Sequence, residues 1–237
     1  MSIRRKPYRR RLYRTLWIQT AFCFFAVNAA FSQESPHALS VSVRRAYVAS
    51  ARLFYQPESI NPDLELSGLT GYGLHVQVPV PGADLSVLLS ADFLSSTVEK
   101  SRVLLLEGFA RRYTVREGIF FVPIELSMLA YIPLGLDPFR VTMSGGVGTY
   151  LAKHLLTVDG VDAEAALSNS AFGIHIDLGF EYRVWQQFSA RAEVRFRDPE
   201  INVESHFAER FDPAPFKSRV SANGMALSLG VVVNLSN

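Results

Sequence analysis

Charged residues of opposite sign alternate with apolar ones along two consecutive segments in the C-terminal third of the chain. If these segments form a hairpin around residues 185–187, paired positions sum to 372, so Glu181 faces Arg191 and Asp177 faces Arg195. Opposite charges that face each other across neighbouring strands attract. The spacing therefore predicts two ion pairs on one face of a hairpin.

Further ionisable residues occupy the polar face of the same or neighbouring segments: Glu125, Arg140, His175, Arg183 and Glu193. One interpretation is a network of ion pairs that fills an interior, and the other is a path for protons or ions. An unpaired charge in a narrow interior is strongly unfavourable. We therefore expect a structural network rather than a path.

Two histidine-containing groups could support catalysis. His175 lies two residues before Asp177 on the same face, a combination that can serve metal binding or acid–base chemistry. Ser205 and His206, with Glu204 and Glu209 near them, contain the residue types of a Ser–His–acid hydrolase. His175 has no evident third partner, however, and neighbouring Ser and His residues are common in solvated loops. We therefore expect no catalytic residues, with a lipid-modifying enzyme as the alternative.

Nothing in the sequence supports a metal ion or a cofactor. Asp159, Asp162 and Glu164 lack the regular spacing of a calcium loop. The glycines of residues 145–148 fall inside a predicted strand, not between a strand and a helix, so they do not form a phosphate-binding loop. We expect neither a metal site nor a cofactor.

The first 32 residues have the order of a secretory signal peptide, with a basic start, an apolar stretch over 16–27 and small residues after it. Residues 1–33 hold seven basic and no acidic residues, which leaves 24 − 7 = 17 basic against 22 acidic residues, a formal charge of −5. An acidic mature chain argues against nucleic-acid binding. The only cysteine, Cys23, lies in this leader. We expect a cleaved signal peptide over 1–32 and one domain over 33–237.

The rest of the chain alternates apolar and polar residues with a period of two, which is typical of β-strands. Most of the segments are about ten residues long, the length that a tilted strand needs to cross a bilayer. Eight such segments are predicted: 39–44, 71–78, 85–93, 122–130, 139–148, 171–184, 188–196 and 225–235.

The connections between these segments alternate between short and long. Short ones fall at 81–83, 133–137 and 185–187, and the long ones at 51–67, 95–117, 152–170 and 197–221. This layout predicts an all-β, eight-stranded, antiparallel up-and-down transmembrane β-barrel with short periplasmic turns and long external loops. The segment 102–117 is rich in β-formers and either extends two strands or caps the barrel.

The composition of the two faces separates a membrane barrel from a soluble one. The polar face is rich in glycine, as expected for a crowded interior, and the apolar face is uniformly bulky, as expected against lipid. Aromatic residues near the strand ends predict girdles at both membrane surfaces: Tyr131, Phe139, Tyr182, Trp185 and Phe188 on the turn side, and Phe93, Phe120 and Tyr150 on the loop side. The alternative is a soluble periplasmic barrel of the lipocalin type with an apolar lumen.

The segments Val122–Gly135 (VPIELSMLAYIPLG) and Phe139–Tyr150 (FRVTMSGGVGTY), set among eight alternating strands behind a leader, resemble the small outer-membrane β-barrel family. That family includes the membrane domain of outer-membrane protein A and the opacity proteins. The chain departs from it in ending Leu235-Ser236-Asn237 rather than in an aromatic residue.

The resemblance implies an outer-membrane location and a structural or adhesive role, with a plugged lumen that does not conduct. The implied partners are outer-membrane lipids or lipopolysaccharide, the barrel-assembly machinery during biogenesis, and an unidentified partner of the external loops. The implied state is a monomer.

Overall fold

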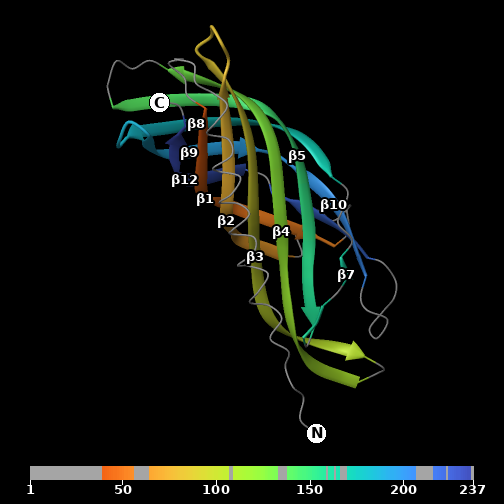
Figure 1. The fold of residues 1–237 in the computed structure, drawn as a ribbon. Coiled ribbons are helices and arrows are strands. Elements are labelled where there is room, and N and C mark those ends of the chain that lie inside the picture. Colours follow the sequence, from red (N-terminus) through yellow and green to blue (C-terminus); the bar gives the residue numbers. More distant parts are fainter. Residues whose placement is uncertain are drawn as a thin grey trace.

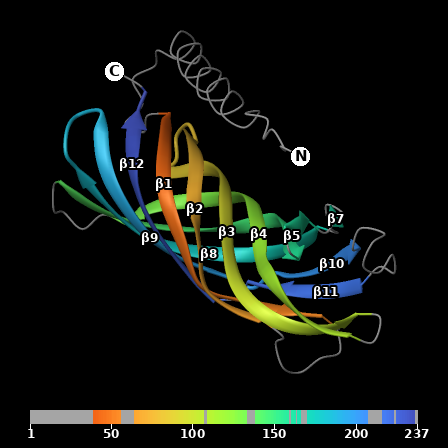
Figure 2. The same cartoon turned by 90° about the horizontal axis from the view of Figure 1, so that it is seen from below.

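A computed structural model gives the fold of the chain, in which long strands wrap around a single axis (Figures 1 and 2). It describes residues 39–55, 64–106, 109–132, 138–158, 160–162, 164–165, 170–206, 216–222 and 224–235. The predicted signal peptide over 1–32 lies outside these residues. Eight strands form the wall: β1 (Ser40–Phe54), β2 (Leu64–Pro79), β3 (Leu85–Leu106), β4 (Phe109–Ile132), β5 (Phe139–Val158), β8 (Ala171–Arg183), β9 (Phe188–Arg197) and β12 (Gly224–Asn234).

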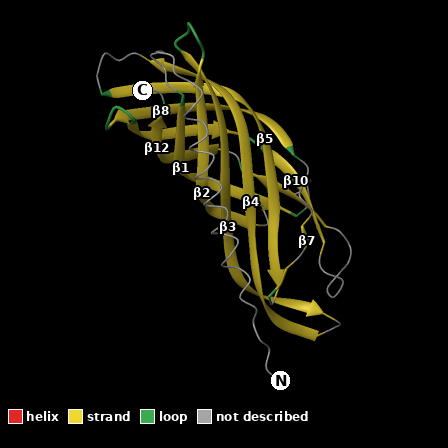
Figure 3. Cartoon of the chain, in the orientation of Figure 1, coloured by secondary structure: helices red, strands yellow, loops and turns green. Residues whose placement is uncertain are grey.

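The eight strands close into a barrel because the last strand pairs with the first. Neighbours follow the chain order β1-β2-β3-β4-β5-β8-β9-β12, and β12 returns to β1 with Asn234 opposite Ser40 and Ala226 opposite Val48. All of these pairs are antiparallel. The predicted fold class, an eight-stranded up-and-down barrel, is confirmed. Among the described residues no helix is long and apolar enough to cross a membrane, and Figure 3 shows strands and turns.

The apolar face of each strand points outward in the turn-side half of the barrel. On β8 the outward side chains of Phe172, Ile174 and Ile176 are 78%, 76% and 62% exposed, whereas His175 and Asp177 between and after them are buried. This is the orientation expected of a barrel in lipid. It is the opposite of what the soluble, lipocalin-like alternative requires.

The strands are longer on the loop side than the sequence predicted. From Leu94 to Leu106 every residue of β3 has a partner in β4, and the pairing ends with Leu106 opposite Phe109, so the segment 102–117 extends both strands and does not cap the barrel. Figure 1 shows this hairpin projecting beyond the rest of the wall. The predicted long connection over 95–117 is therefore wrong, and the one over 51–67 is shortened from both sides by β1 and β2. The register between β3 and β4 stays the same over this extension, so the hairpin continues outside the membrane.

Four further strands lie in the last two long connections: β6 (Val161–Asp162), β7 (Glu164–Ala165), β10 (Glu200–His206) and β11 (Phe216–Ser221). β10 and β11 form a hairpin, and β11 continues the barrel wall by pairing with the loop-side end of β1. β7 pairs with the far edge of β10, and β6 with β5. The wall thus continues beyond the eight-stranded region.

Inside this loop-side extension lies an apolar core that the sequence did not predict. Buried side chains of several strands pack together there: Ala46, Val48, Ala51, Leu53, Leu64, Leu66, Leu69, Leu94, Ile119, Phe121, Tyr150, Ala152, Ile201, Val203, Val220, Ala222 and Ala226. The interior therefore has two zones, a polar one on the turn side and an apolar one on the loop side.

A paired bulge in β1 and β2 marks the boundary between these zones. Val48 pairs with Leu69 and Ser50 with Ser67, so Ala49 and Gly68 are left out of the register. One extra residue in each strand exchanges the inward and outward faces. Gly68 has a φ of 81°, and a Cβ there would lie 2.4 Å from the Tyr47 ring, so glycine is required by both conformation and space.

Inward glycines let the strands of the narrow barrel approach each other, and two neighbours in β5 allow a direct test. A Cβ on Gly146 would lie 2.0 Å from the Leu126 carbonyl oxygen of β4, whereas a Cβ on Gly145 meets nothing closer than 3.6 Å. We expect Gly146→Ala to destabilise the barrel by about 1–3 kcal/mol through overpacking, and Gly145→Ala to change stability by about 0.5 kcal/mol or less. Urea unfolding in lipid vesicles measures both, and equal losses would contradict the tight approach of β4 and β5.

Candidate functional site

The candidate site is a network of charged side chains inside the turn-side half of the barrel. Each of its members is 6% exposed or less. The side chains come from β1, β2, β3, β4, β8 and β9. All of them point inward, because alternate residues of a strand lie on the same face and these belong to the inward face. The members are Arg44, His75, Asp92, Glu125, His175, Asp177, Glu181, Arg191, Glu193, Arg195 and Arg197.

The β8–β9 hairpin supplies the two predicted ion pairs. Its register places Glu181 opposite Arg191 and Asp177 opposite Arg195, as the turn 185–187 predicted. Arg191 donates to the Glu181 carboxylate through Nη2 at 2.6 Å and Nε at 3.0 Å. Arg195 Nε donates to Asp177, which also accepts from Ser144 Oγ at 2.7 Å.

A second set of ion pairs crosses the lumen. Arg44 of β1 donates to Asp92 of β3 from Nη2 at 2.7 Å and from Nε at 2.9 Å. Its Nη1 donates to Glu193 of β9 at 2.7 Å. Arg195 of β9 bonds Glu125 of β4 as well as Asp177 of β8, so its guanidinium joins carboxylates from two different strands. Charge-assisted hydrogen bonds of this kind are stronger than hydrogen bonds between neutral groups.

The network is close to neutral. Arg44, Arg191, Arg195 and Arg197 face Asp92, Glu125, Asp177, Glu181 and Glu193, four positive against five negative charges. Two buried histidines lie among them, with His75 Nδ1 3.8 Å from Glu193 and His175 Nδ1 4.0 Å from Glu125. Near-neutrality is what a desolvated lumen requires, because each unpaired charge there is costly.

Two of the predicted members, Arg140 and Arg183, lie at the turn-side rim and are half-buried. Arg140 is opposite Glu181 in the β5–β8 register, and its guanidinium carbon lies 5.6 Å from the centre of the Tyr131 ring. They flank the network rather than sit within it. The other seven predicted residues lie inside it.

Four members were missing from the predicted set: Arg44, His75, Asp92 and Arg197. The signal that could have found them is the same period of two, since Arg197 continues the series of Arg191 and Arg195. Arg197 Nη1 lies 3.3 Å from Glu125 and 3.7 Å from Asp92, and its guanidinium carbon is 5.3 Å from the centre of the Phe121 ring.

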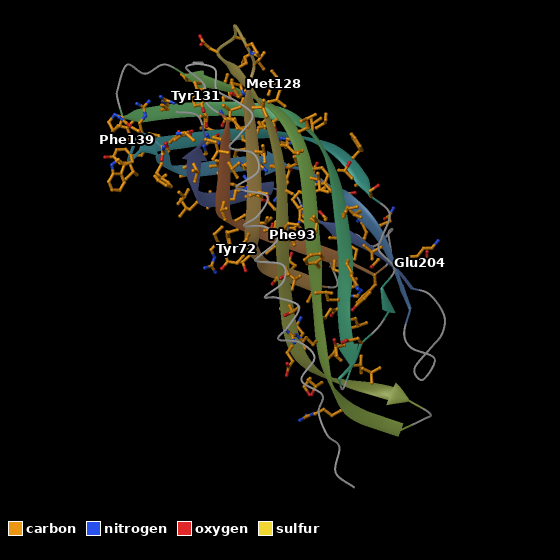
Figure 4. The ribbon with its side chains drawn as sticks, in the orientation of Figure 1. Tyr72, Phe93, Met128, Tyr131, Phe139 and Glu204 are labelled. Carbon is orange, nitrogen blue, oxygen red and sulfur yellow. The ribbon has the colours of Figure 1, made fainter. Side chains whose placement is uncertain are left out.

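Two of the residues predicted for the aromatic girdles point inward instead. Tyr150 is fully buried and stacks on Phe121 with 6.0 Å between ring centres. Tyr131 accepts a hydrogen bond from Gln77 Nε2 at 2.7 Å inside the turn-side rim. Residues an even number of positions apart in a strand lie on the same face. Tyr150 therefore shares the inward face of Ser144 in β5, and Tyr131 shares the inward face of Ser127 in β4. In Figure 4 Phe93 and Phe139 lie on the outside of the wall, where Phe93 is 56% and Phe139 40% exposed.

The comparisons with known proteins identify the architecture. Neither a protein-family model nor a curated protein matches the sequence. The crystal structure of the outer membrane protein OprG from Pseudomonas aeruginosa matches with a TM-score of 0.55 at 16% identity, over 83% of this chain and 95% of OprG. The chain has the fold of a small outer-membrane β-barrel. A major outer membrane protein from Thermus thermophilus (TM-score 0.47, 15% identity, 83% of this chain and 99% of that one) and Neisserial surface protein A (0.45, 14%, 85% and 99%) are also similar.

One Ser–His contact of the kind used in hydrolases does occur in this barrel, but not at the predicted position. Ser127 Oγ and His175 Nε2 are 2.7 Å apart, with Asp177 3.9 Å from the same nitrogen. Both side chains are 3% exposed or less. A nucleophile needs a substrate within reach, so this burial favours a structural hydrogen bond.

The predicted loop residues Ser205 and His206 instead belong to strand β10, opposite Ala165 and Glu164 of β7. Glu204, which precedes them, is exposed on the outside of the wall (Figure 4), and Glu209 lies outside the described residues. Among the residues that the structure describes, no group of three or more His, Cys, Asp or Glu side chains is arranged to hold a metal ion.

A single truncation tests whether the barrel depends on its ion pairs. We expect Glu181→Ala to cost about 3–5 kcal/mol of unfolding free energy, because Arg191 keeps its buried charge and loses its nearest carboxylate. The double variant Glu181→Ala/Arg191→Ala removes both charges and should lose less. Urea unfolding in vesicles gives the three free energies, with Glu204→Ala on the exposed face of β10 as the control expected to stay within about 0.5 kcal/mol. A double variant less stable than the single one contradicts the pairing.

Proposed function

We propose that this protein is exported by the signal peptide over 1–32 to the outer membrane, where it has a structural or surface-presenting role and does not conduct. The observation that carries the proposal is the ion-pair network across the lumen. Arg44 and Arg195 each hold carboxylates from two different strands. A passing ion would have to break several of these contacts in a desolvated interior, which is unfavourable.

The size of the barrel supports the same conclusion. Eight strands enclose an interior that side chains alone can fill. In this protein arginine and glutamate fill the turn-side half, and the apolar core around Leu53, Leu66 and Phe121 fills the loop-side half. An interior filled in this way argues against a pore function.

The loop-side extension is the part of the molecule available to an external partner. β3, β4, β10 and β11 carry it beyond the eight-stranded wall (Figure 1). The proposed partners are outer-membrane lipids or lipopolysaccharide, an unidentified molecule that meets the extension, and the assembly machinery during biogenesis. We propose a monomer, because the closed barrel leaves no free strand edge in its membrane part.

Planar bilayer recordings test the closed lumen. We expect the wild-type protein to produce no discrete conductance steps at neutral pH, because paired side chains occupy the lumen. Glu181→Ala/Arg191→Ala serves as a comparison, since it removes two of those side chains at the turn-side end. Reproducible single-channel steps from the wild-type protein would contradict a non-conducting role.

A shortened variant separates a structural role from a surface-presenting one. Thr97 and Gly118 face each other across β3 and β4, so residues 98–117 can be replaced by a two-residue Asn-Gly turn without altering the membrane part. A strain without the protein should become more sensitive to detergent or lose attachment to a surface. Rescue of detergent resistance by the shortened variant indicates a structural role, and rescue only by the full chain indicates a role of the extension. No defect in either assay argues against both.

A further inference from the structure

In the turn-side half of the barrel, the described outward residues of the eight strands are uncharged at every position except one. The outward residues of β8, β9 and β12 are apolar throughout, and those of β2 to β5 in this half are apolar, Ser, Thr or Gly. The exception is Arg45 of β1, which is exposed on this surface. A charged residue that faces lipid is rare and costly, so its presence requires a specific explanation.

Arg45 is surrounded by exposed apolar and aromatic side chains. Its register partners are Tyr72 of β2, 65% exposed, and Leu229 of β12, 70% exposed. Along its own strand the next outward residues are Val43 and Tyr47, 53% and 42% exposed. Its guanidinium carbon lies 6.0 Å from the centre of the Tyr72 ring, and Figure 4 shows Tyr72 on the outside of the wall.

Within the described part of the chain Arg45 makes no hydrogen bond or ion pair. Two arginines of the same strand show the contrast. Arg44 points inward and bonds Asp92 and Glu193, and Arg52, beyond the bulge, lies 3.3 Å from Glu65. The counter-charge of Arg45 must therefore come from outside the strands that surround it.

The position of Arg45 along β1 indicates where its counter-charge can lie. It lies five residues beyond Ser40, the turn-side end of β1. At about 3.3 Å per residue and a tilt of about 40°, this places its Cα about 13 Å up an apolar band that is about 25 Å tall. Its long side chain can extend toward the loop side, as can the side chain of Tyr72 opposite it, and Tyr47 lies two residues nearer to the headgroup level.

We propose that Arg45, together with Tyr47 and Tyr72, binds the phosphate group of an outer-leaflet lipid A molecule. A guanidinium presents a fork of donors that matches a phosphate, and the two phenol hydroxyls can donate to further oxygens of the headgroup. The acyl chains would lie along the exposed Val43 and Leu229. The inference rests on the proposed outer-membrane location, but not on the closed lumen.

Native mass spectrometry of the full-length mature protein in phosphatidylcholine nanodiscs tests this site. Bisphosphorylated lipid A is titrated into wild type, Arg45→Met, Arg45→Lys and Arg52→Met. We expect Arg45→Met to weaken lipid A binding about tenfold, the loss of one charge-assisted contact, and Arg45→Lys to retain part of it. Arg52→Met, a matched arginine on the same strand, should bind as wild type does. Dephosphorylated lipid A should bind wild type as weakly as phosphorylated lipid A binds Arg45→Met.

Three results would overturn the proposal. Equal lipid A binding by wild type and Arg45→Met removes Arg45 from the site. Equal binding of dephosphorylated lipid A or of phosphatidylglycerol shows that a lipid A phosphate is not what is recognised. A dimer mass that disappears in Arg45→Met assigns the counter-charge to a second protein. Failure of the wild type to enter nanodiscs in a folded, heat-shifting form would instead count against the proposed membrane location.

Discussion

Closure of the barrel is the constraint on which the rest of the structure depends. In a bilayer every backbone N–H and C=O must find a partner within the chain, since lipid offers none. The pairing of β12 with β1 over nine positions, from Ser40 to Val48, provides the last row of partners. With only eight strands the resulting interior is narrow, so every charged side chain that points inward must find its counter-charge there. The cross-lumen contacts of Arg44 and Arg195 follow from this.

The two zones of the interior reflect what lies outside the wall at each level. Where the wall faces lipid, the apolar side chains are outside and polar ones such as Asp92 and Glu125 are left inside. Where the wall extends past the membrane it faces water, and the arrangement reverses, with Leu53 and Leu66 in a core like that of a soluble protein. In β1 and β2 the reversal takes one extra residue per strand at the bulge of Ala49 and Gly68. The apolar core then stabilises the extension independently of lipid.

Much of the membrane part could be predicted because its information is local. Alternation fixes which residues of β8 and β9 point inward, and a short turn fixes their register, so the pairs Glu181–Arg191 and Asp177–Arg195 were predictable from residues ten and eighteen positions apart. The lengths of β3 and β4 were not predictable. Beyond the membrane the two strands pair with each other without needing an outward apolar face, so the apolar pattern does not show where they end. Tyr131 and Tyr150 were assigned to girdles on their type and position, when their parity placed them inside.

The sequence by itself determined the eight strands of the membrane part, their faces and the register of the β8–β9 hairpin, since a period of two and a short turn act over neighbouring residues. Only the tertiary structure decided which charges meet across the lumen: Arg44 reaches Glu193 over a separation of 149 residues, and Arg195 reaches Glu125 over 70. Those contacts depend on how far the strands are staggered when the barrel closes, a property of the whole sheet. The same closure surrounded Arg45 with apolar neighbours from β2 and β12 and left its charge facing the membrane.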